Sequence, residues 1–156
     1  MASQDEFFKI NGAEELGREL RELSRGVQNK ILRPALTKAT GEVRKVAKKN
    51  APVDLGILQK NIKNKTFTAK RGSKGVVGRI GVFSKDVISY GESRGVAIAK
   101  YGAVQEYGKK DGSVKAQEYL AKSLQQAEPQ ATQALIKRTQ DKLDHFHAKQ
   151  ASKYKS

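Results

Sequence analysis

The sequence contains two histidines and no cysteine. The two histidines are therefore the first candidates for a metal site or a catalytic group. His145 and His147 are two positions apart, so on a helix their side chains point about 200° apart and cannot share a metal ion. Asp141 lies four residues before His145 and could share one, but the pair lacks a third ligand. A Ser-His-Asp arrangement is not arguable with both histidines near the C-terminus. We therefore predict solvated histidines, no metal, no cofactor and no enzymatic activity.

A basic, glycine-containing segment offers a second kind of chemistry. Gly72-Ser73-Lys74-Gly75 has too few glycines before a lysine and a hydroxyl residue to be a phosphate-binding loop. Lys70, Arg71 and Lys74 nevertheless put three cations on one turn, and Lys63 and Lys65 precede it. Such cations can reach phosphates without reading base sequence, so they are candidate contacts for DNA or an acidic partner. The alternative is a solvated loop that keeps the chain soluble.

The charge of the whole chain supports a polyanionic partner. Its 156 residues carry 31 Lys and Arg against 16 Asp and Glu, a net charge of +15. Residues 51–115 hold thirteen basic and five acidic residues, so the excess lies mainly in the middle. Such a balance favours nucleic acid or acidic protein surfaces. No apolar run approaches the roughly 18 residues that span a bilayer, and the acidic, polar start is not a secretory signal, so we expect no membrane partner.

Helical periodicity dominates the two ends of the sequence. Leucines recur at helical spacing over residues 13–24, and an alanine-rich apolar stripe predicts a second helix over residues 27–49. Pro34 predicts a kink in that helix or a later start. A third helical stripe covers residues 115–149, which Pro129 makes either one kinked helix or two helices.

Residues 50–62 form the corner at which the helical pattern stops. Pro52 disfavours continuation of the helix, and Asp54 is a plausible N-cap for a short helical turn. Gly56 permits close packing or a backbone conformation that other residues cannot easily adopt, and Leu58 would face the core.

Alternating residues after the corner predict a β-hairpin with strands 62–69 and 76–83, in which the glycines indicate bulges or close approach of another backbone. Weak strand signals follow at residues 87–88 and 96–98, residues 101–107 could be helix or strand, and residues 108–113 read as a turn. We predict an α+β fold in which N-terminal helices and a C-terminal helix pack on a small, mainly antiparallel sheet. The expected organisation is an arm at residues 1–12, one domain at 13–149 and a polar tail at 150–156.

Three segments together resemble a family of bacteriophage tail components, the small neck or tail-completion proteins of long-tailed phages. The corner Ala-Pro-Val-Asp-Leu-Gly-Ile-Leu at residues 51–58 is similar to the family's Ala-Pro-Val-Asp-Thr-Gly-x-Leu, with Leu55 in place of Thr. Residues 101–108, which include Glu106 and Gly108, resemble its Tyr-x-x-x-Val-Glu-Phe-Gly segment. Residues 118–124 resemble the start of its C-terminal helix, although no proline stands near Ala121.

The resemblance implies a structural virion protein without catalytic residues. It implies a homo-oligomeric ring, with six-fold symmetry favoured, at the head-to-tail junction or upper tail of a phage assembled in a bacterial cytoplasm. Its partners would be copies of itself, other neck or tail proteins and, transiently, genomic DNA. The alternative, which depends on charge alone, is a small basic nucleic-acid-binding protein without sequence preference.

Overall fold

The computed structural model describes residues 13–53, 56–68, 75–84, 86–88 and 96–154. Its helices are α1 (Ala13–Glu22), α2 (Arg25–Asn50), α3 (Ile57–Asn61), α4 (Ile98–Tyr107) and α5 (Tyr119–Lys153). Its strands are β1 (Ile62–Thr68), β2 (Val76–Val82), β3 (Val87–Ile88) and β4 (Val96–Ala97). The predicted α+β class is therefore confirmed.

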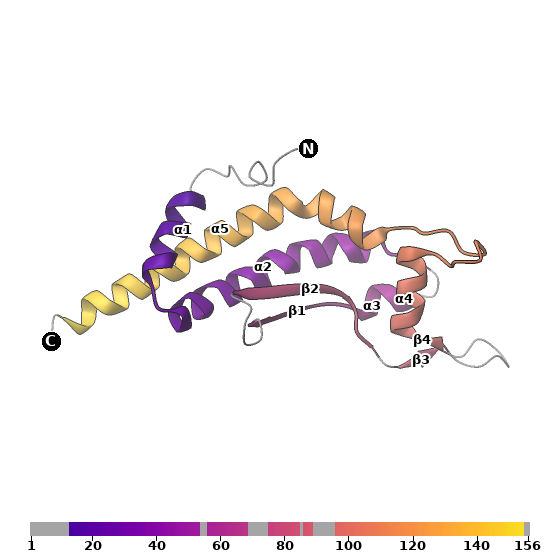
Figure 1. Ribbon diagram of the computed structural model, residues 1–156, viewed down its shortest axis with the longest axis horizontal. Helices are drawn as coiled ribbons and strands as arrows, with labels where there is room; N and C mark the ends of the chain where they lie inside the picture. The colour runs from indigo at the N-terminus through magenta and orange to yellow at the C-terminus, as the bar shows by residue number, and fades with distance from the viewer. Residues whose placement is uncertain (1–12, 54–55, 69–74, 85, 89–95, 155–156) are drawn as a thin grey trace.

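Helix α2 is the central layer of the molecule (Figure 1). Helix α5 runs along it, and the β1–β2 hairpin packs against it from another side, as predicted for the second helix and the sheet. The C-terminal helix thus packs on α2, and α2 lies between it and the sheet. The buried positions of the two long helices are mainly small, which lets their axes approach closely; they include Ala35, Ala39 and Ala47 of α2 and Ser123, Ala127 and Thr139 of α5.

Two of the three prolines lie inside helices. Pro34 is within α2 and Pro129 is within α5, so the second helix does not start late and the C-terminal helix is not divided. An internal proline costs about 3 kcal/mol. In helices of 26 and 35 residues that pack along each other, the remaining contacts offset that cost.

The hairpin register is continuous from Ile62↔Val82 to Thr68↔Val76, so the paired residues contain no bulge. At Gly78 the close approach is to side chains of α2 and not to another backbone. A Cβ there would lie 2.6 Å from Cγ2 of Thr40 and 3.3 Å from Cγ of Leu36. Glycine thus allows the backbone of β2 to lie against these two side chains of α2.

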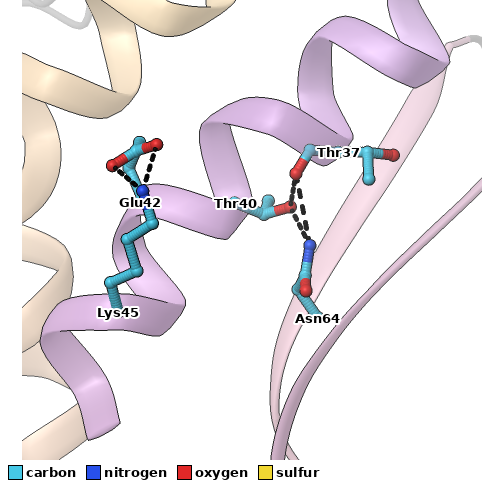
Figure 2. Close-up of polar contacts among 5 residues, drawn as sticks. All are labelled: Thr37, Thr40, Glu42, Lys45 and Asn64. Carbon is cyan, nitrogen blue, oxygen red and sulfur yellow. Dashed lines mark hydrogen bonds and ion pairs between the residues drawn. The ribbon is translucent and has the colours of Figure 1, made fainter.

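Polar side chains fix β1 to α2 (Figure 2). Asn64 donates from Nδ2 to Oγ1 of Thr40 at 3.0 Å and to the Thr37 carbonyl at 3.2 Å. The hydroxyls of Thr37 and Thr66 lie 2.6 Å apart. These contacts explain why the inward face of β1 is polar: it pairs with threonines of a helix rather than with an apolar core.

Two apolar clusters stabilise the ends of the α2–α5 pair. One joins the corner, hairpin, α4 and α5 through Ala47, Ala51, Leu58, Ile62, Ile98 and Tyr119. The other joins α1, α2 and α5 through Leu16, Ile31 and Leu143. Residues 98–107 are helix, which settles the open choice between helix and strand, and β3 pairs with β4 as a second small antiparallel sheet.

Candidate functional site

Glu106 clamps the C-terminal end of α4 to the start of α5. Its Oε2 accepts the N–H of Leu120 at 2.7 Å, and its Oε1 accepts the N–H of Ala121 at 3.1 Å. The first turn of a helix leaves backbone N–H groups without helical partners, and a carboxylate also suits its dipole. The N-cap residue Glu118 makes no side-chain cap bond. The buried Glu106 therefore serves as the cap of α5 from a different helix.

Replacing Glu106 by Ala should lower the free energy of unfolding by about 2–3 kcal/mol, because two helix N–H groups lose a charged acceptor. Glu118→Ala, which removes the same charge from an exposed side chain, is the matched control and should change it by about 0.5 kcal/mol at most. Urea unfolding followed by helical circular dichroism measures both. Equal losses in the two variants would contradict the clamp.

Tyr119 lies directly behind this clamp. Its side chain is buried in the corner cluster, and its hydroxyl has no hydrogen-bond partner among the described residues. Burial and the nearby Glu106 carboxylate raise the pKa of Tyr119 to about 12. The phenol is therefore neutral at physiological pH.

Gly108 ends α4 in a conformation that requires glycine. Its φ is 74° and its ψ is −175°, and a Cβ would lie 2.8 Å from both the Ala116 nitrogen and the Val114 carbonyl oxygen. The chain therefore turns back sharply here. Gln117 and Glu118 then donate backbone N–H groups to the carbonyls of Gln105 and Glu106. Glu106 and Gly108 thus act together: Gly108 makes the turn, and the Glu106 carboxylate accepts hydrogen bonds from the first turn of α5, the helix that follows.

The structure describes three of the four candidate positions of the corner. Pro52 follows the end of α2, and Leu58 is fully buried. Gly56, with φ 64°, occupies the N-cap position of α3. The N-cap is therefore not at Asp54, because the left-handed backbone at the cap favours a residue without Cβ. Asp54 itself lies outside the described residues.

The candidate cations divide between described and undescribed positions. Lys63 and Lys65 are exposed on β1, whereas Lys70, Arg71 and Lys74 lie outside the described residues, between β1 and β2 in sequence. Arg79, which sequence reasoning did not single out, is the register partner of Lys65. Alternation along the strands puts these cations on the face away from α2. We call this face the outer hairpin face; it comprises Lys63, Lys65, Phe67, Val77 and Arg79.

Aromatic rings order two of these cations. The Lys65 ammonium lies 4.6 Å from the centroid of Phe83, and the Arg79 guanidinium lies 5.0 Å from that of Phe67. Like charges directly opposite each other on two strands repel. Lys63, Lys65 and Arg79 have no ion-pair partner among the described residues. An external anion would relieve the repulsion between Lys65 and Arg79.

An open groove of about 760 Å³ lies between α2 and α5 and is bordered by Asn64. We call it the α2–α5 groove. It was not foreseen from the sequence, because its charges come from two helices about 90 residues apart. Its ionisable lining residues are Lys38, Glu42, Arg44, Lys45, Lys137, Arg138 and Asp141. Lys45 pairs with Glu42 at 3.0 Å, and the other four cations have no ion-pair partner among the described residues (Figure 2 shows the Glu42–Lys45 pair).

The histidines lie near the C-terminal end of α5, and His147 is 4.0 Å from Glu19 of α1. Within the described ranges no group of three or more His, Asp or Glu side chains is arranged to hold a metal ion. In the same ranges no helix combines the length and apolar character needed to cross a bilayer.

The fold and its charged faces define a small basic α+β protein. The chain belongs to the HK97-gp10-like family, described as "Bacteriophage HK97-gp10, putative tail-component", whose model matches residues 14–108. The match includes the corner and the Glu106–Gly108 segment and ends before α5. No curated protein and no solved structure matches the chain.

Family membership confirms the resemblance to phage tail components. The chain is a structural tail component of a bacteriophage, which places it in the virion in contact with other phage proteins.

Proposed function

We propose that this tail component is a ring-forming neck or tail-completion subunit, without catalytic activity, that joins head and tail around the path of the DNA. The observation that carries the proposal is the family match over residues 14–108. A closed ring needs a heterologous interface, in which two different faces of each subunit meet. Six-fold symmetry is favoured by the family resemblance.

The outer hairpin face supports a position beside DNA or an acidic neighbour. Its cations have no ion-pair partner among the described residues, and three further basic residues, Lys70, Arg71 and Lys74, follow β1 in the sequence. Phosphate contacts carry no sequence information, so a sparse set of cations tolerates a genome that moves past it. We propose that this hairpin faces the lumen of the ring or an acidic protein surface next to it.

Particles made by a phage that lacks this chain test the function. Electron microscopy should show heads and tails that fail to join, or tails without one ring of density at their upper end. Supplying the chain in trans should restore both the ring and infectivity. Intact joined particles without the chain would overturn the proposal.

A separate prediction concerns affinity for DNA. We expect weak, sequence-indifferent binding by the isolated protein, with a steep dependence on salt. The triple variant Lys63→Gln, Lys65→Gln, Arg79→Gln should bind more weakly, and the slope of log affinity against log salt should fall by about 2–3. Fluorescence anisotropy with one duplex at several salt concentrations measures this.

The matched control removes three charges from the segment after α4. Lys109→Gln, Lys110→Gln, Lys115→Gln gives the same net charge through three exposed residues. An equal loss in both triple variants would mean that net charge, and not the outer hairpin face, sets the affinity. Tight binding by the isolated monomer at physiological salt would instead favour the alternative of a small nucleic-acid-binding protein.

A further inference from the structure

The α2–α5 groove has a charge pattern that a uniformly negative polymer does not match. Lys38, Arg44, Lys137 and Arg138 are without ion-pair partners in the described part of the chain. Glu42 and Asp141 line the same groove. A DNA backbone would bring phosphates toward these carboxylates as well as toward the cations. A protein segment that carries both signs, with acidic residues in excess, can complement all of them.

Helix α1 has this composition. It carries four Glu and two Arg, whereas α2 carries eight basic residues and one acidic residue. Helix α5 has six basic and three acidic residues, and in α4 the charges balance. Among the described helices α1 is therefore the one in which acidic residues exceed basic ones. Because two chains of charge +15 repel each other at long range, a contact between copies requires such a local reversal of sign.

The charged face of α1 is available for a partner. Leu16 and Leu20 pack in the α1–α2–α5 cluster and attach the helix to its own chain. Glu14, Glu15, Arg18, Arg21 and Glu22 are exposed. Ten residues of helix extend about 15 Å, and the α2 border of the groove, from Pro34 to Lys45, extends about 17 Å. The exposed face of α1 thus matches the groove in length and in charge.

We propose that the α2–α5 groove of one copy receives the outward face of α1 from a second copy. The contact is heterologous, because α1 and the groove are different surfaces, and it repeats from copy to copy. The inference rests on the proposed ring, for which it names the two faces that meet. In this contact the carboxylates of Glu14, Glu15 and Glu22 face the groove cations, and Arg18 or Arg21 can face Asp141.

Zero-length cross-linking tests the contact directly. A carbodiimide couples a carboxylate to an amine only where the two touch. The full chain, mixed in equal parts as natural-isotope and ¹⁵N-labelled protein, should give mixed-isotope peptides that join Glu14, Glu15 or Glu22 to Lys38, Lys45 or Lys137. The isotope label separates these from links within one chain, which matters because Glu15 and Lys137 border a common smaller cavity. Mixed-isotope links that avoid α1, or no mixed-isotope link at all, would overturn the inference.

Charge exchange provides the second test. One variant reverses the groove (Lys38→Glu, Lys137→Glu, Arg138→Glu), and the other reverses α1 (Glu14→Lys, Glu15→Lys, Glu22→Lys). Each alone should lose the cross-links between copies, and a mixture of the two should regain links between the variants. Loss without recovery in the mixture would contradict the pairing. Unchanged far-ultraviolet circular dichroism shows that the exposed substitutions preserve the fold.

Two further readouts separate this inference from its alternatives. If a groove-neutralised variant (Lys38→Gln, Lys137→Gln, Arg138→Gln) loses DNA affinity more than the outer-hairpin variant of equal net charge does, the groove is a DNA surface and the inference is wrong. If both reversed variants enter joined particles normally, the proposed function stands while the α1–groove contact fails. If the unmodified chain is absent from particles, the proposed function fails as well.

Discussion

Leu58→Asp should prevent stable folding at 25 °C. Leu58 is fully buried in the corner cluster with Ala47, Ala51, Ile62 and Tyr119. A carboxylate at this position has no cation beside it in the cluster, and burial of an unpaired charge costs about 4 kcal/mol or more. Because whole domains are stable by only about 5–15 kcal/mol, the variant should lose most of its helical circular dichroism or melt far below the parent.

Val53→Asp is the matched control for that experiment. Val53 lies five residues away in the same corner and is 74% exposed. Its replacement should change the free energy of unfolding by about 0.5 kcal/mol at most. Leu58→Ala, with an expected loss of about 2–5 kcal/mol, measures how much of the effect comes from lost packing alone. If Leu58→Asp melted like Val53→Asp, the corner would not be part of the core.

Gly108→Ala should have the second largest effect, although it adds a single carbon atom. The new Cβ would lie 2.8 Å from two backbone atoms, the Ala116 nitrogen and the Val114 carbonyl oxygen, and neither atom can move away easily. The Val114 carbonyl accepts a hydrogen bond from Lys109, and Gly108 itself donates to Val104. With about 1–3 kcal/mol for the backbone conformation alone, we expect a total loss of about 3 kcal/mol or more. Thermal unfolding measures the loss.

Gly112→Ala isolates the steric part of this effect. Gly112 has nearly the same φ, 76° against 74°, and open space where its Cβ would be. It should lose about 1–2 kcal/mol, the cost of a left-handed backbone for a residue with a side chain. The difference between the two variants is the cost of pressing residue 108 against residues 114 and 116. Equal losses would show that the turn after α4 can relax around the added atom.

Local patterns in the sequence were sufficient for the long helices and the β1–β2 hairpin, whereas α4 stayed open between helix and strand. The change from helical spacing to alternation at Pro52 predicted the helix, the corner and the hairpin, because each depends on residues close together in the chain. The register of the hairpin and the close approach at Gly78 depend on α2. The sequence therefore indicated that the glycines matter, but it did not predict which part of the chain Gly78 contacts. At Pro34 and Pro129 the sequence left two alternatives open for a similar reason: packing between the long helices, which are distant in the sequence, offsets the local cost of each proline.

The candidate sites were harder to foresee. Lys63 and Lys65 were visible as basic residues on a strand, but Arg79 joined them only through the hairpin register. Glu106 was recognised by family resemblance, and its capping of Leu120 and Ala121 depends on the turn that Gly108 makes. The α2–α5 groove combines two distant helices and has no signature in either of them. The roles of these faces in assembly are proposals that the experiments above decide.

The position of α2 between the hairpin and α5 also has a consequence for synthesis on the ribosome. Ile31 of α2 packs with Leu143 of α5, more than a hundred residues later in the chain. The hairpin follows α2 within a few residues and can dock on it early, because loop closure over short separations is fast. On the other side of α2, the contacts with α5 form only after most of the protein has been made. Three of the six buried positions of α2 are alanines, so the nascent chain exposes little apolar surface before α5 is synthesised.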